Sequence, residues 1–324
     1  MRTRLVCIIA LWLGISAAMG QAAGRVLPTP QREVAVTFDD LPFVAGGRTR
    51  AELRTLSDDL LRKITDDGIP AVGFVNESKL YDQGVLDTQG IAILKDWLDA
   101  GLELGNHTYS HASLNKMPLA DYEQDVIRGE TETKALMAAR NMPLRYFRHP
   151  FLQVGKDAQT RRALEKFLAE RGYTIAPVTI NHAEWVFAAA YDKAALEGDS
   201  ETMQRVAEAY IPYMELIFKD AEQQSLQLFG HEIKQILLLH ANALNAAHLD
   251  ELAAMIRGRG YHFITLEAAL EDPAYQSPNT YAGSDGVSWL EQWALTFGLR
   301  PQPGPEVPTF VRGLAGRAAY SLGY

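Results

Sequence analysis

Short apolar runs alternate with longer amphipathic segments through most of the chain. The apolar runs are rich in β-branched and aromatic residues and end at polar residues, which is typical of buried strands. The predicted strands cover residues 33–38, 71–75, 101–105, 146–151, 174–180, 235–239 and 261–265. Apolar residues at helical spacing predict helices over residues 51–67, 88–100, 121–140, 157–171 and 245–257. This alternation predicts an α/β fold with a mainly parallel sheet or barrel.

Two parts of the chain depart from the alternation. Residues 186–230 are mostly helical and are longer than one crossover between parallel strands requires, so we expect a helical insertion beside the site. Residues 273–324 are rich in proline and glycine, with Trp289 and Trp293 on a short predicted helix, and we expect this extension to wrap the domain. The roughly 300 residues that follow the leader are long enough to form one large domain with a full core.

The first residues have the pattern of a signal peptide. Arg2 and Arg4 precede an apolar run, and small residues follow, which predicts a leader over residues 1–22 with cleavage after Gly20 or Ala22. Cys7 is the only cysteine and lies inside the apolar run, so neither a lipid anchor nor a disulfide is expected. We therefore expect an exported protein, periplasmic or secreted, without a stable membrane anchor.

The charge of the chain limits the class of partner. The formal net charge of −9 becomes −11 once the two arginines of the leader are removed. No run of lysine or arginine offers a stripe for phosphates, so nucleic acid is not expected as a partner. A neutral substrate, or one with positive character, suits this surface.

Two histidines suggest a metal site. His107 and His111 directly follow a predicted strand, and their spacing of four residues would place both imidazoles on one side of a helical turn. Strand ends are where α/β folds place their chemistry. The alternative is a histidine pair that only caps a helix or lies on the surface, because this spacing alone is weak evidence.

Other strand ends supply what such a site lacks. Asp39 and Asp40 follow the first predicted strand, and adjacent carboxylates need a positive neighbour or a shared proton. Asp40 would be the oxygen ligand that a two-histidine site needs, although a solvated loop is the alternative. Arg148 could hold one aspartate ionised or form a surface ion pair. His240, after the apolar strand 235–239, is a further polar group at a strand end.

Taken in order, these strand ends resemble the sequence blocks of a known family. Thr-Phe-Asp-Asp over residues 37–40, His-x3-His, Arg-x-Pro-Phe over residues 148–151, a turn that carries Trp185, and Leu-Leu-His over residues 238–240 resemble the polysaccharide deacetylases. These are metal-dependent carbohydrate esterases with the NodB homology domain. The resemblance covers residues 33–270 and makes residues 33–272 the catalytic domain. It implies a distorted (β/α)7 barrel with a groove at the carboxyl ends of its strands.

The resemblance also implies roles for these residues. Asp39 is similar to the family's general base, and Arg148 to the arginine that orients and ionises it. Asp40, His107 and His111 resemble the metal ligands, with Zn2+ as the expected ion and Co2+, Ni2+ or Fe2+ as alternatives.

Further implied roles concern the substrate. The backbone N–H of Phe151 resembles an oxyanion donor, and Leu238 with Trp185 would form the wall of the pocket for the acetyl methyl group. His240 resembles the general acid. Asn181 stands where the family commonly has the aspartate that pairs with this histidine, and an amide cannot stabilise an imidazolium by charge. Glu184 is the alternative carboxylate.

These features predict a hydrolase that removes acetyl groups from N-acetylated sugars of a polysaccharide or oligosaccharide. One alternative is an O-acetyl esterase acting on acetylated polysaccharide through the same site. A weakened general acid would favour the ester, because an alkoxide needs less protonation than a departing amine. The other alternative is a carbohydrate-binding relative that has lost catalysis. In each case the expected partner is a carbohydrate.

Overall fold

A parallel sheet organises the structure, which is a computed structural model and describes residues 32–316. These residues form one compact unit. The main sheet has seven strands, in the order β7-β6-β5-β2-β1-β8, with β9 pairing with the beginning of β1. The strands are β1 Arg32–Leu41, β2 Val72–Val75, β5 Glu103–Asn106, β6 Tyr146–Phe147, β7 Thr174–Ile175, β8 Gln235–His240 and β9 Tyr261–Phe263, all paired in parallel. A small antiparallel hairpin, β3 Tyr81–Asp82 with β4 Val85–Leu86, lies apart from it.

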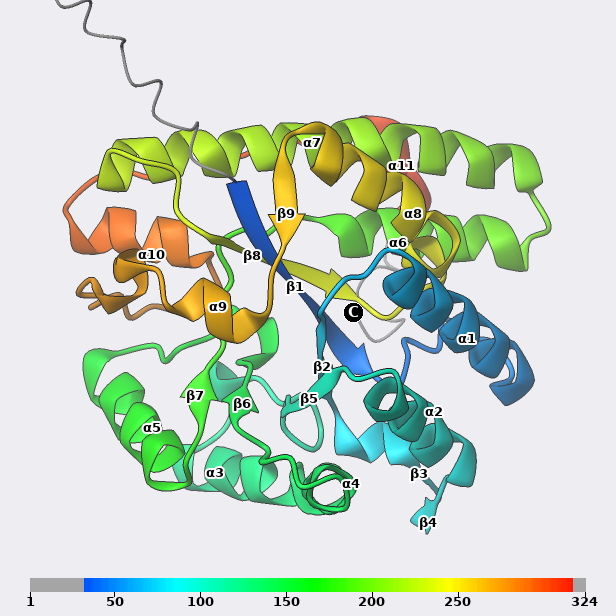
Figure 1. The fold of residues 1–324 in the computed structure, drawn as a ribbon, viewed down its shortest axis with the longest axis horizontal. Helices are drawn as coiled ribbons and strands as arrows, with labels where there is room; N and C mark the ends of the chain where they lie inside the picture. The colour runs from blue at the N-terminus through cyan, green and yellow to red at the C-terminus, as the bar shows by residue number, and fades with distance from the viewer. Residues whose placement is uncertain (1–31, 317–324) are drawn as a thin grey trace, which may run out of the picture. The chain divides into compact units, whose positions relative to one another are not determined.

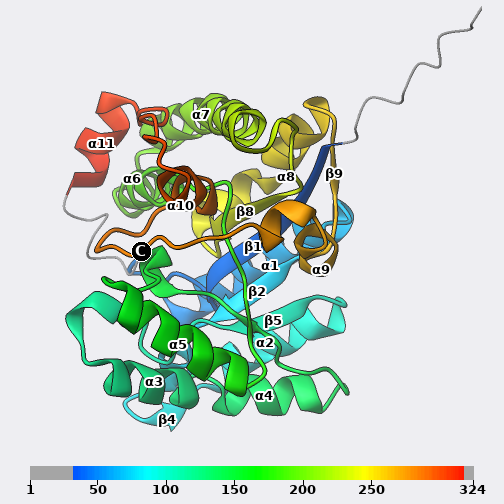
Figure 2. The same cartoon turned by 90° about the vertical axis from the view of Figure 1, so that its left-hand side faces the viewer.

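Helices cover this sheet on several sides. They are α1 Arg50–Asp66, α2 Thr88–Asp99, α3 Leu119–Arg128, α4 Thr131–Ala138, α5 Ala158–Glu170, α6 Glu184–Leu196, α7 Ser200–Phe229, α8 Ala243–Gly258, α9 Leu266–Leu270, α10 Trp289–Thr296 and α11 Thr309–Ala315. Figures 1 and 2 show α6, α7 and α8 on one side of β1 and β8, with α3, α4 and α5 on the opposite side. The prediction of an α/β fold with a parallel seven-stranded sheet is confirmed.

The sheet curls because the segment of residues 174–180 bonds to two strands that are distant in the strand order. Its first half pairs with β6, where the N–H groups of Thr174 and Ala176 donate to the carbonyls of Arg145 and Phe147. Its second half meets β8, where Thr179 and Ile180 both donate to the carbonyl of Ile236. The predicted strand over residues 174–180 is therefore regular only at its beginning, since its backbone turns from one partner strand to the other.

The core forms where β1 and its neighbours bury their apolar side chains. Phe38 and Trp97 are fully buried and meet edge to face at 5.7 Å between ring centroids. Each buried side chain of this size contributes about 2 kcal/mol. The central strands β1, β2 and β8 are buried along most of their length, which accounts for their nearly continuous apolar pattern.

The prediction of one helix over residues 121–140 is wrong. The segment breaks between α3 and α4 at Gly129, where an added Cβ would lie 2.4 Å from the carbonyl carbon of Thr108. The N–H of Tyr109 also donates to the carbonyl of Asp125. The break therefore lets the loop that follows β5 pack directly on the end of α3.

The insertion and the extension both pack against the domain. α6 and α7 pack on each other and on α8, and α11 packs on α6. Trp293 of α10 is fully buried and meets the ring of Phe229 at the end of α7, 5.1 Å between centroids. The predicted leader over residues 1–22 lies outside the described residues. Within residues 32–316, every helix is too short or too polar to cross a lipid bilayer.

Candidate functional site

Two adjacent carboxylates at the end of β1 face the same site because the strand is irregular there. In a regular strand, consecutive side chains point to opposite faces. The pairing register of β1 with β2 shifts between Phe38 and Leu41, and Asp40 has a positive φ of 71°. This bulge re-aims the second carboxylate, so that Asp39 and Asp40 both meet histidines of the loop after β5.

The histidines come from a loop rather than a helical turn, so the predicted geometry of the pair is wrong. Thr108 and His111 have φ values of 64° and 54°, which no helical turn contains. His107 Nε2 lies 3.6 Å from Asp39 Oδ2, and His111 Nε2 lies 3.8 Å from Asp40 Oδ1. The ligand atoms of Asp40, His107 and His111 all lie within 4.8 Å of one another.

The three groups are chemically suited to a divalent ion. Both carboxylate oxygens of Asp40 are buried, and neither accepts a hydrogen bond from the part of the chain that the structure describes. His107 Nδ1 lies 2.9 Å from the carbonyl oxygen of Arg148, to which it donates, and this leaves Nε2 as the lone-pair donor. Burial lowers the pKa of His107 and of His111, so both rings are neutral ligands. This set fits Zn2+, with Co2+, Ni2+ or Fe2+ as alternatives.

Lys79 is a contact of Asp40 that the sequence did not indicate. Its ammonium lies 3.5 Å from Asp40 Oδ1 and donates to the backbone carbonyl of Asp40 at 3.1 Å. Burial alone would raise the pKa of Asp40, but the positive charge of Lys79 lowers it below its ordinary value. Asp40 is therefore an ionised carboxylate.

Asp39 has a different environment. It is buried, and burial raises its pKa to about 6, although the charge of Arg148 acts in the opposite direction. Arg148 Nη1 lies 3.7 Å from Asp39 Oδ2, and its Nη2 donates to Thr37 Oγ1 at 2.8 Å. The Thr37 hydroxyl in turn donates to the carbonyl of Leu237. The arginine is thus held in place beside Asp39, which can exchange a proton near neutral pH.

His240, at the end of β8, pairs with a carboxylate. Its Nδ1 lies 2.8 Å from Glu184 Oε2. Burial would lower the pKa of His240, but Glu184 outweighs that effect and raises the pKa to about 9. Asn181 lines the same cavity as His240. The carboxylate partner is therefore the first residue of α6, two residues before the predicted insertion.

A buried network holds Glu184. Both Asn242 and Asn245 donate side-chain amide hydrogens to Glu184 Oε1, the latter at 2.7 Å. Tyr210 of α7 donates to Asn245 Oδ1 at 3.0 Å. All four side chains are fully buried. The two asparagines follow His240 in the sequence, where their pattern would indicate only residues that cap a helix. Nothing in the sequence indicates the contact between Tyr210 and Asn245.

A cavity of about 280 Å3 joins these groups. The side chain of Phe151 is half-exposed at its rim, and its ring is tilted against that of His111, with 4.4 Å between the ring centroids. Leu238 and Trp185 line the cavity, as does Gly286 of the extension. The lining residues are Asp39, His107, His111, His149, Phe151, Leu152, Asn181, His182, Trp185, Leu238, His240 and Gly286.

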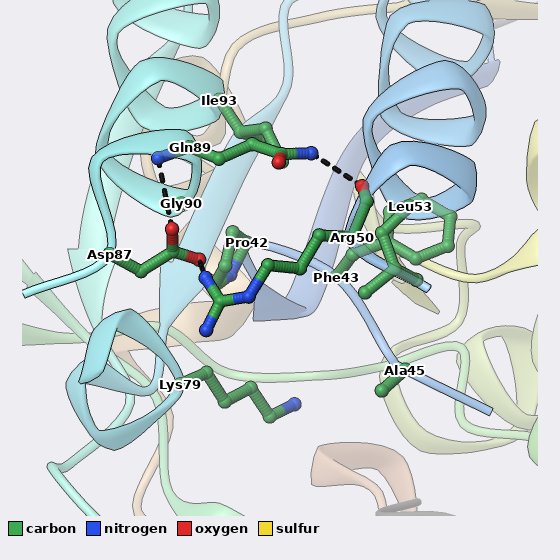
Figure 3. Close-up of a pocket in the computed structure, with 10 residues that line it drawn as sticks. All are labelled: Pro42, Phe43, Ala45, Arg50, Leu53, Lys79, Asp87, Gln89, Gly90 and Ile93. Carbon is green, nitrogen blue, oxygen red and sulfur yellow. Dashed lines mark hydrogen bonds and ion pairs between the residues drawn. The ribbon is translucent and has the colours of Figure 1, made fainter. Parts of the chain in front are cut away.

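A second cavity, of about 290 Å3, shares none of these residues. Figure 3 shows that Arg50 reaches across it to Asp87 and that Lys79 lies below this pair. Arg50 also pairs with Asp82 at 2.9 Å. The charged groups of this second cavity are thus paired with other side chains of the protein. The candidate metal ligands and the groups that can exchange protons belong to the first cavity, in front of Asp39 and His240.

Comparison with known protein families gives a match for the first part of the chain. Residues 27–168 match the model of the family described as polysaccharide deacetylase. No curated protein matches the chain.

Solved structures give weaker similarities. A family 4 carbohydrate esterase from Streptomyces lividans, in complex with acetate, is 17% identical over 74% of this chain and 95% of its own, with a TM-score of 0.42. A peptidoglycan deacetylase from Bacillus subtilis is 16% identical over 75% of this chain and 91% of its own, with a TM-score of 0.44. A pseudoenzyme from Bacillus anthracis is 14% identical over 75% of this chain and 66% of its own, with a TM-score of 0.44. Because each TM-score is below 0.5, none of these similarities supports a conclusion on function.

Proposed function

From the match of residues 27–168 to the polysaccharide deacetylase family, we propose that this protein is a metal-dependent hydrolase. It removes acetyl groups from N-acetylated sugars of a polysaccharide or oligosaccharide. One observation carries the proposal. A three-ligand cluster, a buried carboxylate with a raised pKa and a histidine paired with a carboxylate all meet at one cavity. Hydrolysis of an amide needs a base for water and an acid for the departing amine, and this cavity offers both.

Asp40, His107 and His111 would hold the ion, most simply Zn2+. An ion held there would supply Lewis acidity toward the acetyl carbonyl and toward water. The protein's own part is to keep these ligands in the forms that bind. Lys79 keeps Asp40 ionised, and the carbonyl of Arg148 fixes the tautomer of His107.

Asp39 is the proposed general base. Its carboxylate accepts the proton of the water that attacks the acetyl carbon, and its pKa of about 6 suits that step at neutral pH. Arg148 keeps it ionised and oriented. The backbone N–H of Phe151 is the proposed donor to the tetrahedral oxyanion, and Trp185 with Leu238 is the proposed wall for the acetyl methyl group.

His240 is the proposed general acid. It donates a proton to the nitrogen of the sugar as the C–N bond breaks, and the amine leaves neutral. Glu184 keeps the imidazole protonated up to a pH of about 9. Because the acid has a carboxylate partner, the argument that a weakened acid favours an ester no longer applies. The pairing therefore supports the N-deacetylase over the O-acetyl esterase.

The test is acetate release from a panel of acetylated sugars. The purified protein is incubated with N-acetylglucosamine oligomers, acetylated xylan and 4-nitrophenyl acetate, and acetate is measured by a coupled assay. We expect release from the N-acetylated oligomers. Release from xylan alone would make the protein an O-acetyl esterase, and release from none would support a silent carbohydrate-binding relative. Export to the periplasm or the medium completes the proposal and is checked by fractionation.

A further inference from the structure

A third cavity, of about 210 Å3, lies next to the catalytic cavity. We call it the insertion–extension cavity, because α7 and the C-terminal extension form most of it. Its lining residues are Thr179, Ile180, Asn181, His182, Tyr213, Ile217, Asp220, Ala221, Gln224, Ser288, Glu291, Gln302, Gly304 and Pro305. The family match ends at residue 168, so every one of these residues lies beyond it.

The insertion–extension cavity adjoins the catalytic cavity along two segments. Asn181 and His182 line both cavities, and both are only partly buried. On the facing segment, Gly286 lines the catalytic cavity and Ser288 lines the insertion–extension cavity. The N–H of Trp289 donates to the carbonyl of Val178 at 2.6 Å, which holds the two segments together. The two cavities are therefore neighbours that share Asn181 and His182 as a common border.

The lining of this cavity is polar and acidic. Among its described lining residues there is no lysine or arginine, and two carboxylates, Asp220 and Glu291, face the cavity. Asp220 Oδ2 accepts from Gln224 Nε2, and Glu291 Oε2 accepts from Ser288 at the first turn of α10. The other oxygen of each carboxylate accepts no hydrogen bond within residues 32–316. These oxygens remain available to a ligand.

The histidine on the shared segment adds no positive charge. His182 Nε2–H donates to the carbonyl of Leu238, and its Nδ1 accepts from the N–H of Glu184 at 3.1 Å. Both ring nitrogens are therefore used by the neutral tautomer. The local charge of the cavity is thus negative.

We propose that the insertion–extension cavity is a subsite for a neighbouring sugar unit of the same chain, and that its carboxylates select a unit with a free amine. This rests on the proposed function for the reacting unit. Carboxylates form short, charge-assisted hydrogen bonds with an ammonium group, and amides and hydroxyls bind the remaining sugar hydroxyls. An anionic sugar would meet two carboxylates and be repelled. The preferred substrate is then a partly deacetylated amino-sugar chain.

Binding of a product-like probe tests the subsite separately from catalysis. Isothermal titration calorimetry measures the affinity of a fully deacetylated glucosamine tetramer for the wild-type protein and for Asp220→Asn/Glu291→Gln. Glutamine can keep the capping hydrogen bonds of α10. The matched control is Glu201→Gln/Glu208→Gln, which removes two charges from exposed positions of α7.

We expect the double variant of the cavity to bind the tetramer at least about tenfold more weakly, as expected for the loss of a charge-assisted contact. The control should bind like the wild type, and a galacturonic acid tetramer should not bind measurably. Equal affinity in the wild type and the cavity variant, or no binding to the wild type, would overturn the subsite. Acetate release from N-acetylglucosamine oligomers reports separately on the proposed function, so the two can fail independently.

Discussion

The contact between Glu184 and His240 makes a quantitative prediction about pH. Glu184→Gln keeps the size of the side chain and its acceptor for Asn242 and Asn245, but removes the negative charge 2.8 Å from the imidazole. The new amide N–H would donate to Nδ1, which favours the neutral imidazole. The variant therefore weakens the proton donor while leaving the proposed metal ligands untouched.

The size of the effect follows from the pKa of His240. Glu184 is the main reason that this pKa stands at about 9 instead of the ordinary 6.5. Losing that difference corresponds to about 3 kcal/mol of stabilisation of the imidazolium. Near pH 8 the protonated fraction should fall about 30-fold, and the rate with it. The basic limb of the pH–rate profile should move from about pH 9 to near or below pH 6.5, because burial still disfavours the charged ring.

The assay is the pH dependence of acetate release from an N-acetylglucosamine oligomer. Glu197→Gln is the matched control, since Glu197 is the C-cap of the same helix, is exposed and pairs with Lys193. Because Glu184 is fully buried, circular dichroism melting checks the fold, and Glu184→Asp should keep the limb close to that of the wild type. A folded Glu184→Gln enzyme with an unmoved basic limb would refute the assignment of His240 as the titrating acid.

Three further predictions concern the other polar groups. Asp39→Asn should bind the metal and lose turnover, whereas Asp40→Ala should lose the metal itself. Measuring metal content by mass spectrometry together with the rate of acetate release separates the two cases, and loss of metal in both variants would contradict the assignment of Asp39 as the base. Arg148→Ala should raise the pKa of Asp39, so the acid limb should move above about pH 6, and an unmoved limb in an active variant would show that the arginine does not tune it. Asn181→Asp should barely move the basic limb, because Glu184 already provides the carboxylate; a large upward shift would assign that role to position 181 instead.

Much of the fold could be predicted because the central strands β1, β2 and β8 are buried along most of their length. Residues 236–239 are continuously apolar for that reason, and β8 occupies Gln235–His240. The break at Gly129 could not be predicted, because it depends on a loop twenty residues earlier in the sequence that packs against the glycine. Propensity reports only local preference, and this contact is tertiary.

The candidate site, like the fold, could be predicted only in part from the sequence. Its polar groups could be found because they stand at the ends of parallel strands, which meet at one edge. Their orientation could not be predicted, since Asp40 and His111 both adopt a positive φ that no pattern in the sequence indicates. Glu184 was identified only as an alternative to Asn181, because the choice depends on how α6 begins beside β8.

The most direct test of the central claim is metal dependence of acetate release. The purified protein is treated exhaustively with a chelator, assayed on N-acetylglucosamine oligomers, and assayed again after one equivalent of Zn2+ is added. We predict one bound divalent ion per chain, loss of acetate release on chelation and recovery with Zn2+, with no recovery in His107→Ala or His111→Ala. Full activity in a protein shown by elemental analysis to contain no metal would contradict the account.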